Sequence, residues 1–248
     1  MRNLIPSLAA LAAFACGPLA HAAPEFRAGY GSWRYDIAGT VRDGDRTYDL
    51  QEDLELEAAG RRSIVVEWDT PTSWLPNLAV SFSQVGGSGE AEYRSVSLDL
   101  LGNPLFQDET VRASADFDDV DVTLRYPFGL GPLQAAAGLT VKRLRGEVLI
   151  DDSGNPPPSR QRYDETVPQL HGQLRWPFAR RLAATATGQG ISYDGNRAVE
   201  WRAGAELTLG PVLLEAGWQE KRYEVNLSDY ALDARLDGAV ARVGFVFR

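Results

Sequence analysis

The alternation of apolar and polar residues constrains the fold of this chain more than any other feature of its sequence. From Val199 to Leu209 every second residue is apolar, and the residues between them are Glu, Arg, Gly, Glu and Thr. Segments 120–126, 133–142 and 239–247 show a similar alternation. Successive side chains of a β-strand point to opposite faces, so this period of two predicts strands with one apolar and one polar face. After residue 22, no segment of comparable length shows a helical period.

Ten such strands can be counted along the chain, and the connections between them alternate in length. The strands are predicted near residues 27–39, 61–68, 78–85, 116–126, 133–149, 161–176, 182–192, 198–209, 212–226 and 232–247. Short turns rich in Pro or Gly are predicted near 69–77, 127–132, 177–181 and 210–211. Longer polar connections are predicted near 41–60, 86–115, 151–160, 193–197 and 227–231. This order places all the short turns at one end of the strands.

The first 22 residues predict an export signal. Arg2 gives a positive start, residues 4–19 are apolar and rich in alanine, and Ala20-His21-Ala22 is a small-x-small cleavage site. Cys16 leaves a second possibility open, because a lipoprotein signal also ends in small residues before a cysteine. We expect a signal peptide over 1–22 and one domain over 23–248. That domain has no cysteine and a single histidine, His171.

Charge and hydropathy exclude two classes of protein. The chain has 34 Asp and Glu against 25 Lys and Arg, a formal charge of −9, whereas a nucleic-acid-binding protein normally presents a basic face. After the signal, no segment approaches the roughly 20 consecutive apolar residues of a membrane helix. We therefore expect no nucleic-acid partner and no transmembrane helix. A membrane protein made of strands is not excluded, because its apolar residues are spread one in two.

Two architectures fit many amphipathic antiparallel strands. A soluble barrel or sandwich turns the apolar faces inward, whereas a transmembrane barrel turns them to lipid and the polar faces to the lumen. Full charges in mid-strand, alanine and glycine on the apolar face, and aromatic residues such as Trp68, Tyr126 and Trp176 beside the short turns favour the membrane. We therefore predict an all-β, antiparallel, up-and-down transmembrane β-barrel of about ten strands, with periplasmic termini, in the bacterial outer membrane.

The C-terminal strand, Ala239 to Phe247, resembles the last strand of bacterial outer-membrane barrels. Those strands end in an aromatic residue that the barrel assembly machinery reads, whereas here Phe247 is penultimate and Arg248 is last. Four other stretches are similar to one proteobacterial family of small outer-membrane β-barrel proteins; they are LPNLAVS at 75–81, VTLRY at 122–126, VPQL at 167–170 and GISYDGN at 190–196. The resemblance spans the mature chain. It implies the fold and the location, and it supplies no catalytic residue.

The predicted lumen face carries nearly balanced charges. They are Glu67, Asp119, Asp121, Arg125, Lys142, Arg175, Glu200, Arg202, Glu206, Glu215 and Arg242, with His171 on the same face. One hypothesis is a network of ion pairs that fills the lumen, since about eight strands already leave an interior that side chains can fill. The alternative is a narrow conduit for small solutes. His171 could be a general base or only a hydrogen-bonding group of the lumen.

Basic residues gather at the predicted outer ends of the strands. They are Arg61, Arg62, Arg143, Arg145, Arg160, Arg162, Lys221 and Arg222. Arg binds phosphate bidentately, so these residues could contact lipopolysaccharide, or they could be solvated strand ends. We expect a monomer in outer-membrane lipid, with no cofactor and no metal. The first function hypothesis is a structural or surface-interaction barrel without catalysis; a small-solute channel and a lipid-acting or proteolytic enzyme are the alternatives.

Overall fold

The computed structural model describes residues 24–43, 46–53, 55, 60–72, 74–98, 104–152, 159–226 and 230–248. The expected signal peptide, with Cys16, lies outside the described residues. Among the residues that are described, no helix is long and apolar enough to cross a membrane.

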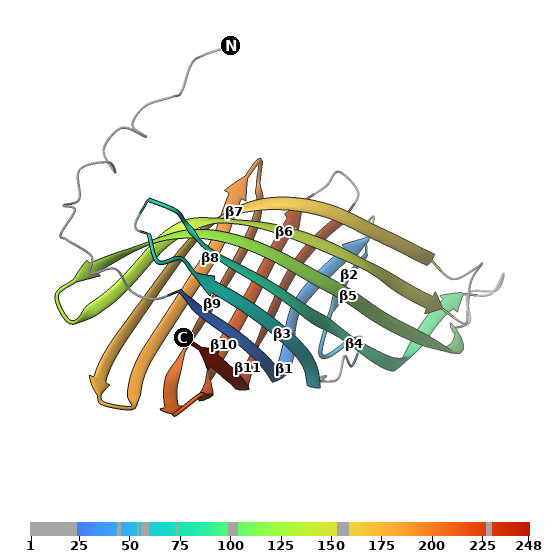
Figure 1. Cartoon of the computed structure of the whole chain (residues 1–248). Helices are drawn as coiled ribbons and strands as arrows, with labels where there is room; N and C mark the ends of the chain where they lie inside the picture. Colours follow the sequence, from blue (N-terminus) through green and yellow to red (C-terminus); the bar gives the residue numbers. More distant parts are fainter. Residues whose placement is uncertain are drawn as a thin grey trace, which may run out of the picture.

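The described chain forms eleven β-strands in one sheet (Figure 1). They are β1 (Glu25–Asp43), β2 (Arg46–Asp49), β3 (Gly60–Asp69), β4 (Asn77–Leu98), β5 (Pro104–Leu130), β6 (Leu133–Asp152), β7 (Ser159–Ala179), β8 (Leu182–Tyr193), β9 (Asn196–Leu209), β10 (Val212–Asn226) and β11 (Tyr230–Phe247).

The sheet closes into a barrel of ten antiparallel strands. Each strand from β3 to β11 pairs with its neighbours in the chain, β1 pairs with β3, and β11 pairs with β1 from Phe26↔Phe247 to Asp43↔Tyr230. The short strand β2 pairs with the end of β1 and is not part of the wall. Closure leaves no free edge around this ring, which is the way an all-strand protein satisfies its backbone groups. The predicted fold class and the count of ten strands are confirmed.

An apolar band, which we call the belt, surrounds the barrel at the end of the short turns. It consists of the outward-facing residues of ranges 26–30, 64–68, 78–82, 120–128, 133–141, 170–178, 182–190, 199–209, 212–218 and 239–247. Large apolar side chains of the belt are open to the surroundings, with Leu139 58% and Leu170 73% exposed. The belt covers nine to eleven residues on β5 to β9, which fits the roughly 9–11 residues of a strand that crosses a bilayer, and five residues on β1, β3 and β4.

Beyond the belt the polarity of the wall is reversed. On β1 the outward residues become Ser32, Arg34 and Asp36, while Trp33 and Tyr35 are buried inside. These inward side chains belong to an apolar cluster that we call the cap; it comprises Trp33, Tyr35, Ile37, Val41, Leu50, Ala234, Leu236 and Val240. The outer part of the barrel is thus built like a soluble barrel, with an apolar interior and a polar exterior.

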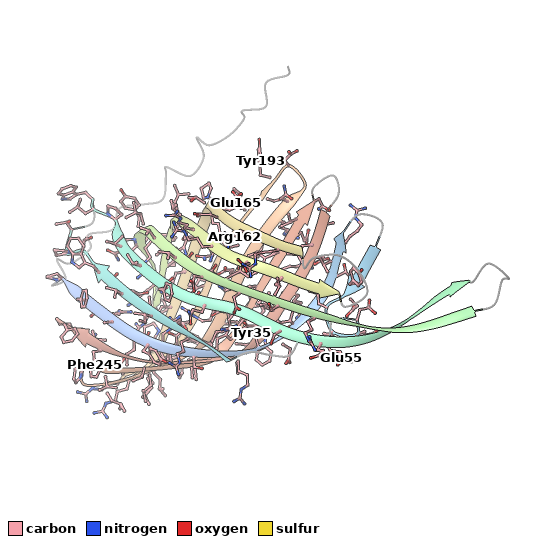
Figure 2. All side chains as sticks on the ribbon, turned by 90° about the vertical axis from the view of Figure 1, so that its right-hand side faces the viewer. Tyr35, Glu55, Arg162, Glu165, Tyr193 and Phe245 are labelled. Carbon is pink, nitrogen blue, oxygen red and sulfur yellow. The ribbon has the colours of Figure 1, made fainter. Side chains whose placement is uncertain are left out.

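Two seams of the wall end at the outer edge of the belt. Strands β3 and β4 pair only from Ser63↔Ser83 to Trp68↔Leu78, and the pairing of β7 with β8 stops at Leu170↔Gly190. Farther out, β4 to β7 continue as a four-stranded extension, and its β4–β5 hairpin projects away from the barrel, at the end opposite Phe245 (Figure 2). The long polar connection predicted over 86–115 is therefore wrong, since most of it pairs as β4 and β5.

Tyr35 joins the extension to the rest of the barrel. Its hydroxyl donates to the Gly86 carbonyl and accepts from the Gly86 backbone N–H, both at 2.7 Å. Gly86 lies on β4 just beyond the last residue that pairs with β3. One side chain from β1 thus takes the place of the missing strand partner at this point.

Candidate functional site

Buried charges meet at the middle of the barrel interior in a group that we call the central cluster. Its members are Asp119 and Asp121 on β5, Lys142 on β6, Glu200 on β9 and Lys221 on β10. The Lys142 Nζ lies 2.8 Å from Glu200, 3.0 Å from Asp121 and 3.3 Å from Asp119. The Lys221 Nζ lies 2.6 Å from Asp119 and 3.4 Å from Glu200. These contacts tie opposite parts of the wall together through the lumen.

Lys221 corrects one sequence prediction. We expected it at the outer surface as a possible contact for lipopolysaccharide, but it is buried in the central cluster and lies 5.6 Å from the centre of the Trp33 ring. Its register explains the difference, because Lys221 lies on β10 an even number of residues from Glu215 and so shares the lumen face. Buried ammonium groups require ionic partners, which Asp119 and Glu200 supply.

The other predicted lumen charges form separate groups toward the short-turn end. Arg125 contacts Glu67 at 3.2 Å and Asp69 at 3.5 Å, and Arg27 joins the same acids from β1. Arg175 contacts Glu206 at 2.6 Å. Glu215 lies between two arginines, Arg202 at 3.0 Å and Arg242 at 3.4 Å.

The twelve residues of the predicted lumen set thus share the inner face, and none lies alone. Sequence reasoning missed Arg27, Asp69 and Lys221, which belong to the same groups. For Arg27 and Asp69 the available signal was their position on the polar face at the ends of β1 and β3.

His171 lies at the lumen face of β7 and is 9% exposed. Its Nδ1 is 3.5 Å from the Gln189 Oε1, and the Gln189 amide nitrogen donates to Asp121 at 3.0 Å and to Glu200 at 3.1 Å. The imidazole is therefore connected to the central cluster through an amide, and among the described residues neither a carboxylate nor a hydroxyl is its direct hydrogen-bond partner. This arrangement suits a hydrogen-bonding group of the interior better than a general base, which would need an orienting acid or a nucleophile beside it.

The arginines predicted at the outer ends are exposed and paired with acids. Arg143 and Arg145 both contact Asp164, and Arg160 and Arg162 both contact Glu147. All six residues lie on the outward face of β6 and β7 beyond the belt, and the four cations contact two anions. Arg143 is two residues past the edge of the belt on β6, whereas Arg160 is ten residues past it on β7. Arg143 holds the pKa of the Asp164 carboxyl below its usual value through a side-chain hydrogen bond.

Three further predicted arginines lie elsewhere at the outer edge. Arg61 contacts Asp116 at 2.7 Å, and Arg62 is exposed beside the end of the β3–β4 seam. Arg222 contacts Glu224 at 2.9 Å and Asp233 at 3.4 Å. The guanidinium groups of Arg61 and Arg222, which were predicted to face phosphate, are thus already paired with acids of this chain.

The packed lumen leaves two small adjoining cavities. The larger, of about 130 Å³, lies between His171, Arg125 and the end of the β3–β4 seam, and the smaller, of about 50 Å³, lies toward the short turns. Glu67, Arg202 and Arg242 line both. In the part of the chain that the structure describes, no group of three or more His, Cys, Asp or Glu could hold a metal ion.

Comparisons with known proteins show the fold. No protein-family model and no curated protein sequence matches the chain. The outer membrane protease OmpT from Escherichia coli has a similar structure, with a TM-score of 0.57 at 11% identity over 90% of this chain and 97% of that chain. Neisserial surface protein A has a TM-score of 0.37 at 10% identity, over 89% of this chain and 96% of that chain. Outer membrane protein AlkL has a TM-score of 0.40 at 12% identity, over 95% of this chain and 95% of that chain. The chain has the fold of bacterial outer-membrane barrels.

Proposed function

We propose that this chain is an integral β-barrel of the bacterial outer membrane, with a structural or surface-interaction role and without catalysis. The observation that carries the proposal is the central cluster, in which the side chains of Lys142 and Asp119 are 2% and 1% exposed and ion pairs cross the lumen. Such an interior stabilises a rigid wall and blocks passage. The proposal includes membership in the proteobacterial family of small outer-membrane barrels that the sequence resembles.

The belt supports the membrane location. Its width fits a bilayer, its exposed apolar side chains would be unfavourable in water, and charged residues such as Arg62 and Arg143 begin where it ends. The predicted export signal accords with this location. Fractionation of the producing bacterium should recover the protein in the outer membrane, in a form whose gel migration changes on heating; recovery in the soluble periplasm would exclude the proposal.

Two barriers lie one above the other in the lumen and argue against the channel alternative. The cap fills the outer part with apolar side chains, and the central cluster fills the middle. The remaining cavities, of about 130 and 50 Å³, are small beside the aqueous channel that 16–18 strands enclose.

Planar bilayer recording tests the filled lumen directly. We expect the purified protein to insert without steady conductance. The double variant Lys142→Ala with Glu200→Ala removes one cation and one anion, so it opens space in the central cluster without changing its charge. Because the cap still fills the outer part, this variant should also stay without steady conductance. Steady single-channel conductance by the wild-type protein would establish a conduit instead.

Incubation with lipopolysaccharide and with peptide libraries tests the absence of catalysis. We expect no turnover of either substrate. Turnover that is lost in His171→Ala and retained in Gln173→Ala, a neighbour on the same face, would make the barrel an enzyme with His171 in its mechanism.

We further propose that the arginines on β6 and β7 contact the phosphates of lipopolysaccharide. Arg143, Arg145, Arg160 and Arg162 outnumber the two acids that they contact. Arg143 and Arg145 lie two and four residues past the belt on β6, at the level of the head groups, and Arg160 and Arg162 lie farther out on β7. Replacing all four with Gln should weaken the binding of purified lipopolysaccharide at least fivefold. Arg235→Gln, which removes an arginine already shared by Glu220 and Asp237, is the control and should bind as the wild type does. Equal binding by all three proteins would refute the contact.

We also propose that the assembly machinery recognises the last strand through Phe247. Phe247→Ala should reduce the heat-modifiable, folded form in outer-membrane fractions. Phe26→Ala alters the aromatic residue paired with Phe247 on β1 and leaves the C-terminal pattern intact, so it should affect assembly less. If both variants lost the folded form equally, the cause would be the packing of Phe26 against Phe247 and not recognition of the last strand.

A further inference from the structure

Four buried nitrogen atoms have no hydrogen-bond partner among the described residues and belong to side chains that line the larger lumen cavity. They are the Trp33 Nε1, the Arg61 Nε, the Arg242 Nε and the His171 Nε2. Trp33 and His171 are themselves more than nine-tenths buried. The first three are N–H donors, so they would all bind an acceptor. Asp121 Oδ1 also lines this cavity, but Lys142 lies 3.0 Å from it and pairs its charge.

The surface of the cavity is rich in cations. Six cationic side chains line it, Arg61, Arg62, Arg125, Arg202, Lys221 and Arg242, against three carboxylates, Glu67, Asp121 and Glu200. Four further acids that pair with these cations lie outside the lining; they are Asp69, Asp116, Asp119 and Glu215. On one side Arg202 and Arg242 share the single carboxylate of Glu215, which leaves a local excess of positive charge. An oxyanion there would neutralise this excess.

The cavity reaches the outer surface through the end of the β3–β4 seam. Its lining includes Arg62 and Gln84, which are both exposed and lie just beyond the last paired residues of the seam, Ser63 and Ser83. On the outside of the same seam, the next pair toward the short turns is Ile64↔Phe82, whose side chains are 52% and 38% exposed. A polar interior site is therefore joined to the apolar belt by an opening in the wall.

We propose that this cavity binds the acidic head group of a membrane amphiphile, a carboxylate or a phosphate, whose tail leaves through the end of the β3–β4 seam and lies on the belt. A cavity of about 130 Å³ has room for a small head group. Arg61 and Arg62 lie at the entrance, and Trp33 and Arg242 lie inside.

Titration of the full-length mature protein in nanodiscs of a zwitterionic phospholipid tests the assignment. The readout is the indole N–H resonance of Trp33, which is identified by its disappearance in Trp33→Phe. Protein-free nanodiscs correct for the amphiphile that partitions into the lipid. Dodecanoate and dodecyl phosphate should shift this resonance to saturation. Dodecanol and dodecyltrimethylammonium, which lack the anion, should leave it in place. No saturable shift with either acidic amphiphile would overturn the proposal.

Free acetate and inorganic phosphate separate the two sources of the anion. We expect each to bind at least tenfold more weakly than the dodecyl compound with the same head group. Equal affinity of the free ion and the amphiphile would overturn the part of the proposal that concerns the tail and the seam.

Two variants test the residues. Arg61→Gln, at the entrance, should weaken dodecanoate binding at least fivefold by the indole shift. Trp33→Phe removes one N–H donor and keeps the aromatic packing. It should also weaken dodecanoate binding at least fivefold, measured by calorimetry because the indole signal is lost. Arg235→Gln and Trp218→Phe, on the outer surface, are the matched controls and should bind as the wild type does. Heat-modifiable migration verifies that each variant is folded, and unchanged affinity in folded Arg61→Gln and Trp33→Phe would overturn the site.

Discussion

Lys142 contacts three carboxylates in the middle of the barrel and has a side chain only 2% exposed. Replacing it with Met would keep the length of the side chain but leave Asp119, Asp121 and Glu200 with the single cation Lys221. Removing one partner from a buried ion pair typically costs about 3–5 kcal/mol, because the remaining charge stays desolvated. We expect Lys142→Met to lower the free energy of unfolding by about this amount in urea titrations in micelles.

The control for this prediction is an exposed pair. Arg145 and Asp164 are both about half exposed, so Arg145→Gln should change the free energy of unfolding by less than about 1 kcal/mol. If Lys142→Met proved as mild as Arg145→Gln, the central cluster would not be a stabilising element.

Asp164 lies outside the belt and predicts a pH effect. Its pKa in the folded protein is lowered chiefly by the hydrogen bond from Arg143. A lowered folded-state pKa means that this contact stabilises the protein above the pKa of the unfolded state and is lost as the pH falls through the folded value. An NMR titration of the Asp164 carboxyl should therefore give a pKa below that of an ordinary Asp. Arg143→Gln should raise it, and an unchanged value in that variant would exclude Arg143 as the cause.

The position of each lumen residue could be predicted from the period of two, but its partner could not. Glu200 and Arg202 are evidently inward because they alternate with Val199 and Trp201. That Glu200 meets Lys142 from β6 depends on which side chains reach across the lumen, and the sequence contains no local signal for this. Lys221 lies near the outer end of β10, where an exposed cation is expected, but it is on the same face as Glu215 and therefore points into the lumen.

At the level of the strands, Tyr35 is the contact that connects β1 to β4 where β3 no longer pairs with it. Tyr35→Phe would leave the buried N–H and C=O of Gly86 without this partner, at a cost of about 1–3 kcal/mol. Hydrogen exchange at the Gly86 amide should become faster in this variant. Tyr30→Phe, which changes an exposed tyrosine of the same strand, should leave the exchange unchanged. Similar rates at Gly86 in wild type and Tyr35→Phe would contradict this role.

The strands inside the belt could be predicted closely, and the extension beyond it could not. Predicted ends such as 212–226 agree with β10, because one face of each strand there is apolar. Residues 88–98 and 104–114 pair over their whole length, yet polar residues stand at both parities, for example Glu90 on one face and Glu109 on the other. No apolar face therefore repeats over the whole segment for a period of two to detect.

Closure of the whole barrel can be tested by cross-linking. Ser32 on β1 and Ala241 on β11 are paired directly across the closing seam. Cys16 is the only cysteine in the chain and lies in the predicted signal, so a mature Ser32→Cys, Ala241→Cys variant has two thiols about 4.5–5.5 Å apart at Cβ. Oxidation should link them and change migration of the heated protein on a gel.

The control for closure moves the second cysteine from β11 to β9, which is three strands away from β1. Ser32→Cys with Ala205→Cys puts one thiol on β1 and the other on β9, so oxidation should form no intramolecular link. If neither variant cross-linked, or both did, the seam between β1 and β11 would not be as described.

The reversal of polarity along the barrel has a consequence for how it sits in a bilayer. Sliding it outward would bring short-turn charges toward hydrocarbon, and sliding it inward would submerge Arg62 and Arg143, where an arginine at the midplane costs ~2–4 kcal/mol. Its depth is therefore fixed by its own surface. A membrane whose core is thicker than the belt must thin around the protein, so each molecule imposes a local thickness on the lipid that surrounds it.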